Sequence, residues 1–149
     1  MLAAAALTGC SRELEPVDVP RPPVSGAEAD AACRALLDRL PDEVDPGVRR
    51  REVRDPARTA AWGDPPVTLE CGVPAPDPLD APLVVNGTGF TVHDVGRATR
   101  WTTYGRTVRA AVTIPDRYEN GVELVYPLAE PLGGLPADPS AEPLEGTTR

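Results

Sequence analysis

Apolar residues recur at helical spacing near the start of the chain, and Pro41 closes this first pattern. The apolar positions are Ala29, Ala32, Cys33, Leu36, Leu37 and Leu40. Residues three and four apart lie on one side of a helix, so the spacing predicts a helix with one buried face. Ser25, with Glu28 three residues later, predicts a capping box at its start.

The middle of the chain changes to an alternating pattern that is typical of half-buried strands. Val67, Leu69 and Cys71 alternate with Thr68 and Glu70. Further strands are expected at 83–86 and 90–94, which pair around Gly87 and Gly89, and at 99–104 and 107–114, which turn near Gly105. The polar stretch that contains Arg49, Arg50 and Arg51 is compatible with a short strand through Val53.

A second helical pattern covers residues 122–132, where Pro127 is expected to kink or shorten the helix. Together the patterns predict a single small α+β domain over 27–135. We expect a mostly antiparallel sheet of four to six strands, with one helix before it and one after it.

The first ten residues carry a targeting signal. Residues 1–9 (MLAAAALTG) are apolar or small, and Leu7-Thr8-Gly9-Cys10 resembles a bacterial lipobox, in which a peptidase cuts before a lipid-bearing cysteine. We interpret 1–9 as a truncated signal peptide, since it lacks a basic start that an upstream codon would supply. The run is far shorter than the ~20 residues that span a bilayer. The alternative is a short apolar start of a cytoplasmic chain.

Proline-rich polar segments flank the predicted domain. Residues 10–26 contain Pro16, Pro20, Pro22 and Pro23 and are interpreted as a semi-extended tether. Residues 136–149 are polar and interrupted by proline, and we expect a disordered tail.

The three cysteines fit an exported protein. With Cys10 assigned to the lipid, Cys33 on the helix stripe and Cys71 on the strand face both point toward one core. An oxidising compartment then favours a disulfide between them. The alternative is a pair of buried free thiols.

Composition excludes one class of function. The formal net charge is −8, whereas nucleic-acid-binding domains carry a basic surface that displaces counterions. All the basic residues are arginine, which is also what a GC-rich genome encodes.

The string Trp62-Gly63-Asp64-Pro65-Pro66, followed by Leu69-Glu70-Cys71-Gly72, resembles the domain-of-unknown-function family 3515. Cys33, Leu40-Pro41, Asn86-Gly87 and Tyr104-Gly105-Arg106 extend the resemblance over roughly residues 30–133. It implies secreted or lipoprotein-like proteins of high-GC Gram-positive bacteria with paired cysteines. It implies no activity and no catalytic residue.

Candidate catalytic chemistry is sparse. His93 is the one histidine, and its place in the alternation predicts a solvated surface residue; Ser11, Ser25 and Ser140 lie outside the predicted sheet. This inventory favours neither a hydrolytic triad nor a zinc site, and no cofactor is expected. Asp64 and Asp94 are candidates for carboxylate chemistry on cell-wall material, although turn roles are the competing interpretation for Asp64 and Asp116.

Arginine suggests one binding site. Arg100, Tyr104, Arg106 and Arg109 are expected near one another on the later strand pair, with Arg100, Tyr104 and Arg106 on one strand face, where guanidinium groups beside a Tyr hydroxyl could bind an anion. Ordinary surface arginines are the alternative. We therefore expect a lipid-anchored module on the extracytoplasmic face of the cell membrane. Its expected partner is an envelope protein or an anionic envelope ligand, and the competing hypothesis is a carboxylate-dependent enzyme.

Overall fold

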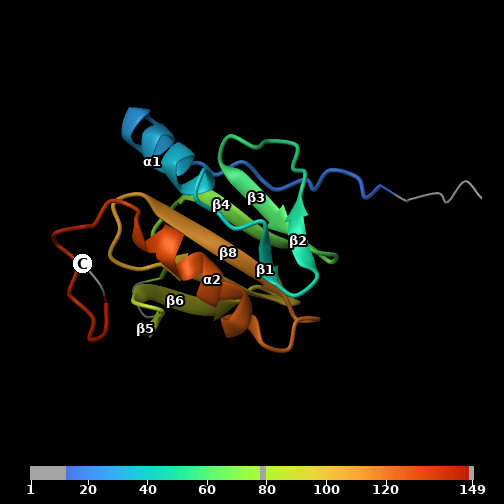
Figure 1. Cartoon of the computed structure of the whole chain (residues 1–149). Helices are drawn as coiled ribbons and strands as arrows, with labels where there is room; N and C mark the ends of the chain where they lie inside the picture. The colour runs from blue at the N-terminus through green and yellow to red at the C-terminus, as the bar shows by residue number, and fades with distance from the viewer. Residues whose placement is uncertain (1–12, 78–79, 148–149) are drawn as a thin grey trace, which may run out of the picture.

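The computed structural model describes residues 13–77 and 80–147, which fold into two helices and eight strands (Figure 1). The elements are α1 (Ala27–Leu37), β1 (Glu43–Asp45), β2 (Val48–Arg51), β3 (Thr59–Trp62), β4 (Val67–Val73), β5 (Pro82–Val85), β6 (Thr88–Asp94), β7 (Ala98–Thr103), β8 (Arg109–Pro115) and α2 (Gly121–Gly133).

All eight strands form one antiparallel sheet in the order β1-β2-β3-β4-β8-β7-β6-β5. The predicted α+β domain, with a helix at each end, is confirmed. The predicted count of four to six strands is wrong. The chain before β4 forms three strands of three or four residues. β2 and β3 do not alternate between buried and exposed positions, and β1, which does, is only three residues long. Without that alternation, a short strand carries little signal in sequence.

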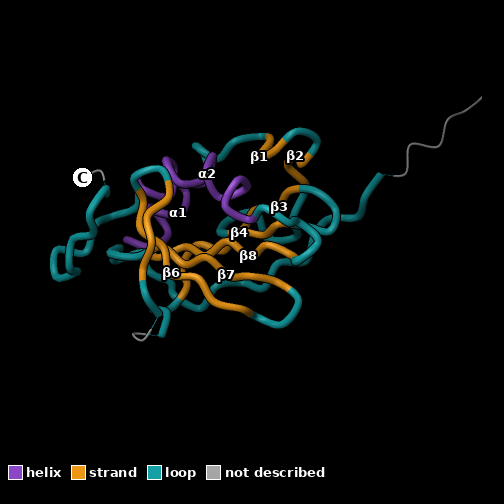
Figure 2. The backbone as a smooth tube through the Cα atoms, turned by 90° about the horizontal axis from the view of Figure 1, so that it is seen from below, coloured by secondary structure: helices purple, strands orange, loops and turns teal. Residues whose placement is uncertain are grey.

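Both helices lie on the same side of the sheet, as the view from below shows (Figure 2). α2 contacts β8 and β6, and it also contacts the two edge strands β1 and β5. The sheet therefore curls around α2. Its core side chains include Leu69, Phe90 and Val112, which join the apolar faces of both helices in one cluster.

α2 continues through Pro127 and Pro131, so the predicted closing helix is confirmed but is not shortened by its proline. Each interior proline costs about 3 kcal/mol. Burial of Leu124, Val125, Leu128 and Leu132 contributes roughly 1.5 to 3 kcal/mol for each side chain. Packing against the curled sheet therefore outweighs the local cost of the two prolines.

The tight hairpin between β5 and β6 was predicted correctly. Asn86 and Gly87 have φ values of 45° and 78°, as a two-residue type I′ turn requires. Val85 pairs with Thr88 on either side of this turn.

The start of α1 differs from the predicted capping box. Gly26 is the N-cap residue, and no side chain caps the helix. Glu28 instead accepts a hydrogen bond from the Thr107 hydroxyl at 3.5 Å. The helix therefore depends on tertiary contacts rather than on a local cap.

The structure contains the disulfide between Cys33 of α1 and Cys71 of β4, both of which are fully buried. It closes a loop across a sequence separation of 38 residues, which corresponds to about 4 kcal/mol on the chain-entropy estimate. This bond is the covalent connection between α1 and the centre of the sheet.

Residues 17–24 lie against the domain, whereas the sequence predicted a tether over 10–26. Val17 forms a parallel bridge with Val53, and Val19 is buried beside Val53 and Ala61. The Val24 amide donates to the Gly72 carbonyl at 2.9 Å. The described end of the predicted tail is also attached, because Ala137 pairs with Arg106 and the Asp138 amide donates to the Gly105 carbonyl at 2.9 Å.

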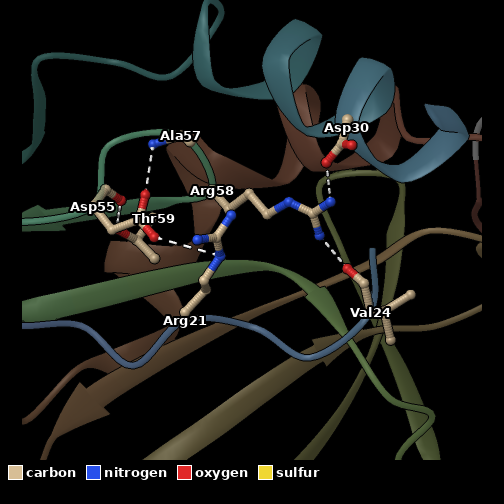
Figure 3. Close-up of polar contacts among 7 residues, drawn as sticks. All are labelled: Arg21, Val24, Asp30, Asp55, Ala57, Arg58 and Thr59. Atoms are coloured by element: carbon tan, nitrogen blue, oxygen red, sulfur yellow. Dashed lines mark hydrogen bonds and ion pairs between the residues drawn. The ribbon is translucent and has the colours of Figure 1, made fainter. Parts of the chain in front are cut away.

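Arg58 joins this N-terminal segment to α1. Its side chain is only 4% exposed, and its guanidinium donates to the Val24 carbonyl and to the Asp30 carboxylate (Figure 3). Gly72 lies directly beside this contact with φ +101°, and a Cβ there would be 2.6 Å from the Val24 carbonyl oxygen. Close approach of three chain segments thus requires glycine at this position.

Replacement of Asp30 tests the contribution of the contact between the buried Arg58 guanidinium and the Asp30 carboxylate, whose side chain is 52% exposed. Asp30→Asn removes the charge that compensates the Arg58 guanidinium, and we expect a loss of about 1 to 2 kcal/mol in the free energy of unfolding. Glu28→Gln is the matched control, because it removes an exposed acid from the same first turn of the helix while its amide oxygen can still accept from the Thr107 hydroxyl. Urea denaturation measures both variants, and equal losses would contradict the role given to Arg58.

Candidate functional site

The face of the sheet away from the helices carries polar side chains around two adjoining cavities. On β7, Trp101 belongs to the core and is 8% exposed, whereas Arg100 and Thr102 line a cavity. Polar residues on the neighbouring strands share this face. Arg100 pairs with His93 of β6 on one side and with Thr113 of β8 on the other.

Arg100 has an acidic partner on this face. One guanidinium nitrogen lies 2.5 Å from Glu70 Oε2 and 3.2 Å from Thr113 Oγ1, and the two charged side chains are 23% and 14% exposed. An incoming anion would therefore compete with Glu70. The Arg100 guanidinium is best described as part of a half-buried ion pair that crosses β8.

The first cavity has a volume of about 430 Å³ and includes Arg100, His93 and Asp80 in its lining. His93 Nδ1 lies 3.7 Å from Asp80 Oδ2, and this buried ring nitrogen has no hydrogen-bond partner among residues 13–77 and 80–147. His93 lies on the outward face of β6, as predicted, but its side chain is only 35% exposed, and the segment that follows β4 lines the same cavity. Ser140 does not complete a triad with it, since its hydroxyl donates to Asp138 at 2.6 Å.

The second cavity has a volume of about 460 Å³ and shares four lining residues with the first. The shared residues follow β4 and are Ala75, Pro76, Asp77 and Asp80. Tyr104, Arg109 and Thr91 belong to the second cavity, together with Asp138, Ser140 and Glu142 from the segment after α2. Two chain segments that are distant in sequence thus border one depression beside β6 and β7.

The predicted anion site is divided by the structure. Tyr104 and Arg109 line the second cavity, and Arg100 lines the first. Arg106 instead donates to the Leu135 carbonyl at 2.9 Å, and burial lowers the pKa of its guanidinium. The shared strand face predicted for Arg100, Tyr104 and Arg106 is wrong because β7 ends at Thr103 and Gly105 turns the chain with φ +68°. Anion binding itself stays a prediction.

Asp64 and Asp94 do not converge on a common site. Asp94 of β6 pairs with Thr99 of β7, which pairs in turn with Ile114 of β8. The next strand across the sheet is β4, where Val67 lies nearest to this line of paired residues. Asp64 lies in the turn before Val67, so about three inter-strand spacings, roughly 14 Å, separate the two acids along the sheet. Glycosidases hold their paired carboxyl groups about 5 to 9.5 Å apart.

Several residues of this face were not anticipated from the sequence. Asp80, Asp138 and Glu142 come from irregular segments, where no periodicity predicts a neighbour. Glu70 was placed correctly on the side of β4 away from the core, yet its partner Arg100 lies on a strand two positions away in the sheet. Only the order β4-β8-β7 reveals that pair.

Three further points concern the lipid anchor, metal binding and membrane-crossing helices. Cys10 lies outside the described residues, so its lipidation stays a prediction. Among residues 13–77 and 80–147, no group of His, Cys, Asp and Glu side chains is suited to hold a metal ion. Within the same ranges, no helix has the length and apolar character needed to cross a bilayer.

The fold and this face define a disulfide-bonded α+β protein, in which one curled antiparallel sheet holds two helices on one side and bears polar cavities on the other. The chain belongs to the family described as "Protein of unknown function (DUF3515)", whose model matches residues 1–139. No curated protein and no solved structure gives a match to the chain.

The string that carries the family resemblance has a structural role here. Trp62 is fully buried, its indole nitrogen donates to the Pro41 carbonyl at 2.9 Å, and the Arg50 guanidinium lies 5.1 Å from its ring. A Cβ on Gly63, with φ +72°, would approach the Tyr118 hydroxyl to 2.5 Å. These residues build the β3–β4 hairpin and line neither of the two adjoining cavities.

A double-mutant cycle on Arg100 and Glu70 measures how strongly this face is held by its own ion pair. Arg100→Met and Glu70→Gln should each destabilise the domain, and the coupling free energy should be about 1 to 2 kcal/mol because both side chains are mostly buried. Exposed ion pairs give at most about 1 kcal/mol. Coupling near zero in urea denaturation would show that the pair is screened like a surface contact.

Proposed function

We propose that this protein is a lipid-anchored, non-enzymatic binding module on the extracytoplasmic face of the cell membrane. The observation that supports this proposal most directly is the pair of adjoining cavities on the helix-free face of the sheet. Their volumes fall in the range of small-ligand sites, and polar side chains converge on them from four separate segments.

The anchor is supported by sequence and by the character of the domain. The lipobox-like residues end at Cys10, and a buried disulfide fits a compartment outside the reducing cytosol. Val17 is paired with Val53, so only the six residues 11–16 lie between Cys10 and the body of the domain. Such a stretch reaches at most about 25 Å. A lipid on Cys10 would therefore hold the domain close to the bilayer.

The competing enzyme hypothesis loses its best candidates in this arrangement. Asp64 and Asp94 are too far apart along the sheet for paired acid and base work, and the Ser140 hydroxyl is bonded to Asp138. Arg100 on the open face pairs with Glu70. Such a surface is suited to recognition, where a ligand exchanges with existing contacts.

Membrane fractionation tests the anchor. The full-length protein should be recovered with membranes and require detergent for release, and its intact mass should include a lipid on Cys10. Cys10→Ser should move the protein out of the membrane fraction, because no other anchor is proposed. Recovery of the wild-type protein in the cytosol with an unmodified Cys10 would overturn this part of the proposal.

Photo-cross-linking in cells tests the binding face. A photoreactive phenylalanine analogue at Tyr104, which borders the second cavity, should give reproducible adducts that mass spectrometry identifies. Tyr126 is the matched control, since this tyrosine is 57% exposed on α2 at the opposite side of the sheet. Adducts that are equal at both positions, or absent at both, would contradict binding at this face.

A further inference from the structure

We infer that the second cavity is a site for a small organic cation that carries a protonated amine. This inference rests on the proposed binding function and specifies that the ligand is positively charged. It also departs from the anionic ligand expected from the arginines, because most of the charged side chains that line this cavity are acidic.

Carboxylates dominate the lining of this cavity. Asp77 and Asp80 come from the chain between β4 and β5, and Asp138 and Glu142 come from the segment after α2. Arg109 is the one basic residue in the lining, and the Arg100 guanidinium of the adjoining cavity is paired with Glu70. The formal charge of the lining is therefore strongly negative, which favours a positively charged ligand.

Asp138 contributes its negative charge to this lining at neutral pH. The Asp138 carboxylate accepts hydrogen bonds from the Ser140 hydroxyl at 2.6 Å and from the Ser140 amide at 2.9 Å. These bonds lower the pKa of Asp138, and the nearby Arg109 charge lowers it further. Asp138 consequently stays ionised and partly compensates Arg109.

An independent feature of the wall is a hydroxyl group without a partner. Thr91 is only 2% exposed, lines this cavity, and its Oγ1 forms no hydrogen bond in the described part of the chain. A buried hydroxyl that has lost water and gained no partner destabilises the free protein. A ligand that hydrogen-bonds to Thr91 would remove this deficit, and an ammonium group is a donor that a hydroxyl oxygen accepts.

The size and spacing of the site favour an organic ligand over a metal ion. The described acids form no cluster that could hold a metal ion, so their charges are spread around the cavity. A volume of about 460 Å³ accommodates a small molecule whose charged end reaches the carboxylates while its remainder contacts Tyr104 and Pro76.

Three probes of equal chain length test the sign of the charge. 1,5-Diaminopentane, 1,5-pentanediol and glutarate differ only in their amine, hydroxyl or carboxylate ends, and isothermal titration calorimetry with the full-length protein compares them. We expect the diamine to bind at least ten-fold more tightly than the diol, glutarate to be weakest, and added NaCl to weaken diamine binding. NMR shifts should locate the diamine at Thr91 and Tyr104.

Variants connect this binding to the proposed residues. Asp80→Asn should weaken diamine binding roughly 10-fold or more, since it removes a charged acceptor. Thr91→Val should weaken it about 2- to 10-fold while raising the melting temperature of the free protein, because valine replaces an unpaired hydroxyl with a similar shape. Asp45→Asn, an exposed acid on β1, is the control and should change neither measurement.

The outcomes separate this inference from the proposed function. Equal binding of the three probes, tighter binding of the diol or glutarate, or no binding by any of them overturns the cation site. Adducts at Tyr104 in cells would still support the binding module in each of those cases. If a protein is captured at Tyr104 while the diamine fails to bind, the proposal of a small cationic ligand is wrong, and the ligand of this face is a protein.

Discussion

The attachment of α1 to β4 is the constraint on which the rest of the structure depends. The Cys33–Cys71 disulfide crosses this junction, and the next residue, Gly72, allows the N-terminal segment to approach the sheet. Arg58 then joins that segment to α1 through the Val24 carbonyl and the Asp30 carboxylate (Figure 3). A helix without a local cap is held by one covalent bond and by one ion pair whose Arg58 side chain is buried. A domain with few aromatic residues gains from such a bond, because its core alone supplies a modest stability.

Placing both helices on one side of the sheet leaves the other side to loops and polar side chains. α2 contacts strands at both edges, so the sheet curls around it and its helix-free face is bordered by the segments after β4 and after α2. The N-terminal segment covers the part of this face near β3, where Val19 and Val53 enclose Ala61. The part near β6 and β7 stays open to the two cavities. The architecture thus separates the structural half of the open face from the half proposed for binding.

Charge on this face is arranged differently from what the arginine count suggested. Arg100 is paired with the Glu70 carboxylate, and Arg106 donates to the Leu135 carbonyl. Arg109 lies near the negative charge of Asp138. The second cavity is left with several carboxylates and with the Thr91 hydroxyl, which has no hydrogen-bond partner among the described residues. A cationic ligand therefore suits this cavity better than the anion expected from arginine alone, because the acids that decide its potential come from segments without regular structure.

The alternating and helical patterns of the sequence were sufficient for α1, β4, the β5–β6 hairpin, β7, β8 and α2, and for the cysteine pairing, since each depends on local periodicity or on one shared core. They could not predict β1, which is only three residues long, or β3, whose four residues are all buried and therefore do not alternate. The partners of charged residues were also beyond reach: Glu70 meets Arg100 only because β8 separates β4 from β7, and Asp80 meets His93 only because an irregular segment returns over β6. Local sequence decides which side of a strand a residue occupies. Tertiary structure alone decides what it faces there, because strand order and loop paths are set by the packing of the whole domain.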